Sequence, residues 1–126
     1  MEIWEDVKGY EGLYQVSNFG KARSLTRMIA TSINNNKIRK QIGRVLSLYK
    51  DKGGYPRIQL CALGDIKTKT IHTLVWDAFG DKPRNGRKLQ IDHIDNNKSN
   101  NHISNLQLLT PRENVRKRFK KKEMEK

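Results

Sequence analysis

The sequence holds a single cysteine, Cys61, among its 126 residues. One cysteine excludes a disulfide within the chain, and it excludes zinc sites built from several cysteines. Because Cys61 stands inside an apolar segment, we expect it to be a core residue. The sequence also lacks an apolar run of the length of a signal peptide or a membrane span, so a cytoplasmic protein without membrane contact is expected.

Apolar residues are scarce at 35%, and charged residues are frequent at 31%. A chain of this length forms at most one ordinary domain, here with a thin core. Acidic residues become rare after the first 20 residues, which carry a net charge of −3, so the rest of the chain carries +16. A field of this size suits a polyanion, and nucleic acid is the first candidate partner.

Residues 1–25 are predicted to form a small hairpin. Leu13–Ser17 alternates in the manner of a strand, residues 18–20 give a turn signal, and Lys21–Leu25 returns. Its aromatic core is expected to hold Trp4, Tyr10, Tyr14 and Phe19. The string GYEGLYQVSNFGKARSL from Gly9 resembles the NUMOD-type module that begins many phage and intron-encoded homing endonucleases. The resemblance implies that this module helps to bind DNA.

Residues 26–44 contain five basic residues and no acid, and they are predicted to be a basic linker or long loop. The segment is either a solvated connection or an arm along the phosphate backbone. Residues 45–80 are predicted to form a three-stranded antiparallel sheet and a helix, with strands at Val45–Tyr49, Tyr55–Ala62 and Ile66–Ile71. An apolar stripe at helical spacing from Ile71 to Phe79, ended by Gly80, predicts the helix.

Four polar residues of this sheet, if its strands pair as hairpins, share one solvent face: Arg57, Gln59, Lys67 and Lys69. Such a face either lies in a DNA groove or is an ordinary polar outer surface. His72 lies beside the apolar stripe of the helix. It is predicted to be structural, because no acid or second histidine stands at metal-binding spacing beside it.

Residues 81–126 carry the candidate site. A short strand ends in Asp92 and His93, a loop rich in asparagine follows, and Asn105 opens the returning strand. Thr110-Pro111-Arg112-Glu113 predicts a helix start with a capping box. Asn114 then occupies the fourth helical position, where an apolar residue usually packs back on the incoming chain, so its amide is expected to point at the strands.

Asp92 and Asn114 together offer two hard oxygens, which suit Mg²⁺ or Mn²⁺. His93 supplies an imidazole, and a neutral imidazole, with its unperturbed pKa of ~6.5, suits a general base. Asn105 is expected either to hold the loop or to orient the base. Asp95 is expected either to cap the loop or to act as an outer-shell acid, and His102 to cover or cap the ribbon. The remaining asparagines of the loop are predicted to form turns: Asn96, Asn97, Asn100 and Asn101. Arg112, Arg116 and Lys117 on the final helix are expected to bind phosphates.

This arrangement resembles the HNH endonuclease motif, the ββα-metal site, in its homing-type version. The matching residues are Asp92-His93, the string ending at Asn105-Leu106, and Glu113-Asn114; the string IHTLVWDAFG also resembles the lead-in helix. The resemblance implies one Mg²⁺ or Mn²⁺ per site held by Asp92 and Asn114, His93 as the base and Asn105 as the orienting residue.

The sequence therefore predicts an α+β protein in which small antiparallel sheets and a packed helix precede a ββα-metal motif. The expected function is metal-dependent cleavage of double-stranded DNA to 5′-phosphate and 3′-hydroxyl ends, by a monomer that nicks or a homodimer that cuts both strands. Two alternatives stay open: a non-catalytic DNA-binding protein or regulator on the same scaffold, and a sequence-independent nuclease of the toxin type.

Overall fold

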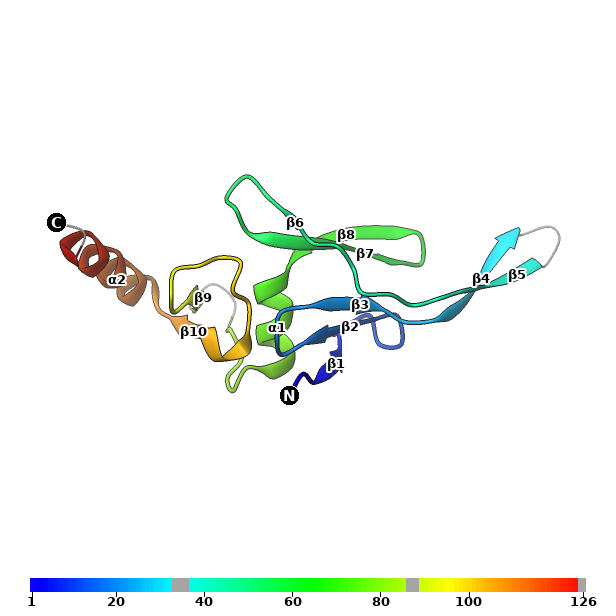
Figure 1. Cartoon of the computed structure of the whole chain (residues 1–126), viewed down its shortest axis with the longest axis horizontal. Coiled ribbons are helices and arrows are strands. Elements are labelled where there is room, and N and C mark those ends of the chain that lie inside the picture. The colour runs from blue at the N-terminus through cyan, green and yellow to red at the C-terminus, as the bar shows by residue number, and fades with distance from the viewer. Residues whose placement is uncertain (33–36, 86–88, 125–126) are drawn as a thin grey trace.

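The computed structural model describes residues 1–32, 37–85 and 89–124, and it is an α+β protein built from small antiparallel sheets and two α-helices (Figure 1). In the described ranges four sheets occur, with strand orders β1-β2-β3, β4-β5, β6-β7-β8 and β9-β10. The last described element is helix α2 (Pro111–Met124), which extends away from the rest of the molecule in Figure 1. The predicted fold class is confirmed.

The N-terminal hairpin forms as predicted and gains one strand. β2 (Tyr14–Ser17) pairs with β3 (Ala22–Ser24), and β1 (Trp4–Asp6) pairs with the other edge of β2. The expected aromatic core is only half right. Tyr10 and Tyr14 are buried and meet edge to face with ring centroids 5.9 Å apart, whereas Phe19 is 40% exposed and packs outside this sheet.

The segment predicted as a linker or long loop is instead a hairpin, so that prediction was wrong. β4 (Arg27–Ser32) pairs with β5 (Lys37–Gln41), and the hairpin projects away from the core at the right of Figure 1. Backbone pairing holds it, because Met28, Ile38 and Ile42 are each more than 60% exposed. The side chains of this hairpin whose burial the structure describes form no buried apolar face, and without such a face a strand need not alternate in sequence, so the strands were missed.

The second sheet is smaller than predicted at its first strand. Val45 bridges to Arg23, and the Leu46 amide donates to the Ala22 carbonyl at 2.8 Å, so this stretch joins the N-terminal sheet. Of the predicted first strand only its end joins this sheet, where β6 (Tyr49–Lys50) pairs with β7 (Pro56–Ala62). β7, β8 (Asp65–Thr70) and α1 (Ile71–Phe79) lie within one residue of the predicted ranges.

One apolar cluster joins the segments that the sequence analysis treated separately. It is formed by residues of β2, β3, β7, α1 and β10 together with the turn that carries Tyr10. Ile58, Leu60, Ile71 and Val75 are at most 2% exposed, and burying each such side chain contributes about 1.5–3 kcal/mol. Cys61 lies at the edge of this core and is half-buried. In the described residues no helix is long and apolar enough to cross a membrane.

Candidate active site

The site is built on a two-stranded ribbon whose two faces carry different residues. β9 (Gln90–His93) pairs with β10 (Leu106–Leu109), so that Asp92 lies opposite Gln107 and His93 lies opposite Leu106. Because neighbours along a strand point to opposite faces, Gln90 and Asp92 share the face toward α2. His93 lies on the other face and is only 5% exposed.

The capping box at the start of α2 forms as predicted. The Thr110 hydroxyl accepts the Glu113 amide at 3.2 Å, and the Glu113 carboxylate accepts the Thr110 amide at 3.1 Å. The hydrogen bond from the Thr110 amide is the main cause that lowers the pKa of Glu113. Asn114 therefore lies one turn into the helix, and its side-chain nitrogen donates to Gln90 Oε1 at 2.8 Å. The amide points at the ribbon, in the direction that the cap predicts.

A cavity of about 300 Å³ brings the predicted site residues together. Its walls include Asp92, His93 and Asn114. Three cationic residues, Lys98, Lys117 and Arg118, also line it. Asp92 and Asn114 thus meet around one cavity although 22 positions of sequence separate them, whereas Asn105 does not line it.

Lys117 was predicted to bind phosphate, but its side chain does not extend freely into solvent. Its ammonium donates to Asp92 Oδ2 at 2.5 Å and to the His93 carbonyl at 2.6 Å, and its side chain is 24% exposed. Gln107 also donates to the same Asp92 oxygen, at 2.8 Å. The Asp92 side chain is 12% exposed, and its ion-pair partner, Lys117, also lines the cavity.

These contacts test whether the site fits a divalent cation. The Lys117 ammonium already binds the Asp92 carboxylate. The Asn114 side-chain nitrogen donates to Gln90, which leaves Asn114 Oδ1 as an acceptor. Hard oxygen donors at the wall of a polar cavity suit Mg²⁺ or Mn²⁺. In the described part of the chain no group of three or more His, Cys, Asp and Glu side chains is placed to hold a metal.

The His93 ring is held by a residue that the sequence analysis assigned only to turn formation. His93 Nε2 lies 2.6 Å from Asn101 Oδ1, and Asn101 is only 3% exposed. An amide oxygen only accepts, so Nε2 carries the hydrogen and Nδ1 carries the free lone pair. Four asparagines of the loop have similar sequence surroundings, and no local signal separates Asn101 from the other three.

Asn105 holds the loop and does not contact His93. Its side-chain nitrogen donates to Asp95 Oδ1 and to the Asn100 carbonyl, both at 2.9 Å, and its oxygen accepts the Asp95 amide at 3.2 Å. A hydrogen bond from Asn100 and others from Asn97 and Asn105 lower the pKa of Asp95 to about 2. Of the two roles expected for Asn105, this geometry supports the bracing of the loop.

His72 is the residue on α1 that lies against the site. Its ring centroid is 5.3 Å from that of His93 and 5.2 Å from that of Tyr55, and its Nδ1 is buried without a partner in the described residues. Burial is the main cause that lowers the pKa of His72 to about 4, and smaller electrostatic effects of His93 and Arg84 act in the same direction. The prediction that His72 has a structural role agrees with this packing.

The low pKa of His72 predicts an acid-sensitive fold. The unfolded chain takes up a proton at His72 near pH ~6.5 and the folded chain only near 4, so stability is complete above ~6.5 and falls between these values. We expect His72→Phe, which keeps an aromatic ring, to reduce this acid-dependent decrease in the free energy of unfolding by on the order of 2 kcal/mol. Thermal melts of both proteins across this range measure it, and parallel pH profiles would contradict it.

The predicted DNA-binding face of the sheet is not one face. In the pairing of β7 with β8, Lys69 lies opposite Ile58 and Lys67 opposite Leu60, so both lysines project to the side of the buried residues. Arg57 and Gln59 project to the other side. Arg57 also pairs with Asp51 at 3.5 Å, whereas Gln59, Lys67, Lys69, Arg112 and Arg116 are exposed.

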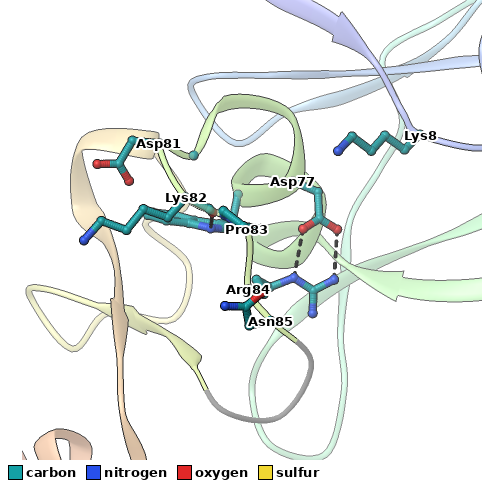
Figure 2. Close-up of a pocket in the computed structure, with 9 residues that line it drawn as sticks. Lys8, Asp77, Asp81, Lys82, Pro83, Arg84 and Asn85 are labelled. Carbon is teal, nitrogen blue, oxygen red and sulfur yellow. Dashed lines mark hydrogen bonds and ion pairs between the residues drawn. The ribbon is translucent and has the colours of Figure 1, made fainter.

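A larger cavity, of about 480 Å³, lies at the end of α1 and lacks the candidate catalytic residues (Figure 2). Arg84 forms a two-pronged ion pair with Asp77 there, at 2.8 and 2.9 Å, which raises the pKa of the guanidinium. Trp76 Nε1 donates to the Lys82 carbonyl at 2.9 Å. These contacts hold the chain that follows α1 against the helix, and the candidate catalytic residues line the smaller cavity instead.

A two-stranded ribbon with Asp-His at its end, a braced polar loop and a capped helix that returns an asparagine define a ββα motif of the HNH type. Comparison with known proteins agrees: the profile of the HNH endonuclease family matches residues 69–116, and that of the NUMOD4 motif matches residues 2–61. The C-terminal part of the chain is thus homologous to the HNH endonuclease family, and the N-terminal part carries a NUMOD4 motif.

Among its relatives, DNA endonuclease I-HmuI of Bacillus phage SP01 is 38% identical over 112 residues, which cover 89% of this chain and 55% of that protein. An uncharacterized HNH endonuclease, L245, of Acanthamoeba polyphaga mimivirus is 34% identical over 90 residues, 65% of this chain and 27% of that protein. The chain thus spans little more than half of the phage relative. A solved structure, described as DNA binding and cleavage by the HNH homing endonuclease I-HmuI, superposes with a TM-score of 0.75 at 36% identity, over 94% of this chain and 59% of that one.

Proposed function

We propose that this protein is a metal-dependent DNA endonuclease that nicks one strand per active site. The observation that carries the proposal is the cavity at which Asp92, His93 and Asn114 meet, flanked by Lys98 and Arg118. The formal charge of +13 supports a polyanionic substrate, and the similar I-HmuI structure is described as one of DNA binding and cleavage. We place its action in the cytoplasm of a host cell.

In this proposal Asp92 and Asn114 hold Mg²⁺ or Mn²⁺, which when bound supplies Lewis-acid stabilisation of the negative charge that develops on the phosphate. His93 takes a proton from the attacking water at Nδ1, the nitrogen that Asn101 leaves with a free lone pair. The water oxygen bonds to phosphorus as the bond to the 3′ oxygen breaks. The products are a 5′-phosphate and, after that oxygen takes a proton from solvent, a 3′-hydroxyl.

Cations around the cavity suit the substrate backbone. Arg118 and Lys98 line the cavity itself, and Lys98 also donates to the Gly53 carbonyl at 2.6 Å, which ties the loop to the β6–β7 turn. Arg112 and Arg116 are exposed on α2. We propose that these residues bind phosphates next to the cut, and that Gln59, Lys67 and Lys69 contact the duplex further away.

The deciding experiment incubates supercoiled plasmid with the protein and Mg²⁺ or Mn²⁺, with and without EDTA. We expect nicked circles to appear first, and only with the metal, because one site cuts one strand. Linear plasmid as the first product would indicate a homodimer. Binding in a gel-shift assay without nicking at any salt concentration would favour the non-catalytic DNA-binding alternative. Competition with random DNA separates a site-specific enzyme from a sequence-independent one.

The position of Lys117 gives a prediction about metal affinity. Its ammonium binds the Asp92 oxygen that a divalent ion would need. Because Lys117→Met removes this charged hydrogen bond, it should raise the affinity for Mn²⁺ about tenfold, which corresponds to about 1.4 kcal/mol of binding free energy. The same change should lower the melting temperature in EDTA. Electron paramagnetic resonance of free Mn²⁺ measures the affinity.

Arg116→Met is the matched control, since it removes one positive charge from the exposed side of the same helix. We expect it to change Mn²⁺ affinity by less than about twofold, as screened surface charges do. Equal effects of the two substitutions would show that only net charge matters and that Lys117 does not compete for Asp92.

A further inference from the structure

The turn of the N-terminal NUMOD4 motif lies directly on the loop of the nuclease motif. The Asn18 carbonyl accepts the Ile103 amide at 2.9 Å. The Phe19 ring stacks on His102 with centroids 4.8 Å apart and planes 27° apart. This contact explains why Phe19 is absent from the core of its own sheet. The turn thus acts as a surface against which the loop before Asn105 is ordered.

Gly20 makes the closest approach. A Cβ at this position would lie 2.8 Å from Asn101 Cβ and 2.9 Å from the Asn101 carbonyl carbon and oxygen. Gly20 also has φ +89°, a conformation that disfavours other residues. The backbone of the turn therefore touches the backbone of Asn101 with no space for a side chain between them.

Hydrogen bonds within the N-terminal motif hold this turn in place. The Ser17 hydroxyl, buried completely, accepts the amides of Phe19 and Lys21 at 3.2 Å. Asn18 Oδ1 accepts the Ile3 amide at 2.7 Å, which ties the turn to the start of the chain. A fixed turn in contact with Asn101 limits where the Asn101 side chain can lie, and that side chain holds His93 Nε2 at 2.6 Å.

We propose that residues 18–20 are a positioning element of the nuclease site: through Asn101, they set the orientation and the tautomer of the His93 ring. This inference rests on the proposed role of His93 as the general base, and it gives the N-terminal motif a task in catalysis besides any contact with DNA. Displacing the turn should release Asn101, let His93 adopt either tautomer and slow the chemical step.

The test compares two glycines of the same motif. Gly20→Ala and Gly12→Ala impose a similar backbone strain, since Gly12 has φ +79°, but nothing lies within 4 Å of a Cβ at Gly12. We expect Gly20→Ala to lower the nicking rate at saturating plasmid about 100-fold, the effect of a base misplaced by about 1 Å, with the KM for DNA changed less than about threefold. Gly12→Ala should keep both values within about threefold.

A spectroscopic readout tests the same chain of contacts without metal or DNA. In EDTA at alkaline pH, ¹H–¹⁵N correlation spectra of the full chain should show His93 as the Nε2–H tautomer in the wild type and in Gly12→Ala. Gly20→Ala should show a mixture of tautomers. Since this measurement needs no cleavage, it reports on the inference even if plasmid nicking fails and the proposed function falls.

Asn101→Ala and Phe19→Ala are the further variants in case Gly20→Ala does not fold. Asn101→Ala, with folding checked by circular dichroism, should reproduce the mixed tautomer and the loss of rate, and Phe19→Ala should do so in part. A single Nε2–H tautomer and an unchanged rate in these variants would overturn the proposal. Equal losses in Gly12→Ala and Gly20→Ala would overturn it as well, because strain within the N-terminal motif would then explain both.

Discussion

His93→Ala should abolish plasmid nicking while leaving DNA binding intact, and this is the largest effect that we expect from a single substitution. A positioned general base contributes about 10²–10⁴-fold to the rate, and no other described side chain in the cavity wall carries an imidazole. The ring is 5% exposed and makes its side-chain hydrogen bond inside the protein, to Asn101, so its loss should affect chemistry far more than binding.

Nicking time courses with Mg²⁺ or Mn²⁺ measure this effect, and gel shifts in EDTA measure binding. Removing a buried ring also leaves a cavity beside His72 and Tyr55, so the melting temperature should fall by several degrees. Assays are therefore run well below the melting temperature of the variant. A His93→Ala protein that nicks as fast as the wild type would refute the enzyme proposal outright.

Asp92→Asn should reduce metal affinity and cleavage together. The substitution keeps the shape of the side chain but removes the negative charge that faces the cavity, so it removes the stronger of the two proposed metal ligands. Loss of the Lewis acid is worth several kcal/mol, and we expect the rate to fall at least about 100-fold. The variant also removes the ion pair with Lys117, so stability in EDTA should fall as well.

Asp81→Asn is the charge-matched control, since Asp81 is exposed and lies at the larger cavity after α1. Titration of Mn²⁺ by electron paramagnetic resonance separates the two variants without any cleavage assay. We expect Asp81→Asn to bind Mn²⁺ within about twofold of the wild type. Wild-type Mn²⁺ affinity in Asp92→Asn would place the metal elsewhere and would leave Asp92 as the partner of Lys117 alone.

Much of the candidate site is readable from local sequence patterns. The capping box of Thr110 and Glu113 determines where α2 starts, and that start places Asn114 toward the ribbon. The alternation of β9 and the asparagine-rich loop mark the ribbon and its bend. These signals span only a few residues, and the structure reproduces them because short-range hydrogen bonds and φ/ψ preferences govern them.

The faces of the central sheet were predicted less well. Arg57 and Gln59 were placed on the solvent side of β7, and Ile58 and Leu60, which alternate with them, are buried. Which residues of β8 share their side depends on the register of the pairing, and this register places Lys67 and Lys69 with the buried residues. A shift of one residue reverses every side chain of a strand, so alternation within one strand says nothing about its neighbour.

The sequence by itself determined the class of this protein through the order of the two motifs, the helix of residues 71–79 and the capped final helix. It also marked Asp92, His93, Asn105 and Asn114 as the candidate site residues. Only the tertiary structure decided that Asn101 holds His93, that Lys117 stands on Asp92 and that the turn at residues 18–20 lies against the loop. The physical reason is the range of the forces involved. Periodicity and capping act over one or two turns of chain, whereas these contacts join segments up to about 80 residues apart, and they form only when one shared core brings those segments together.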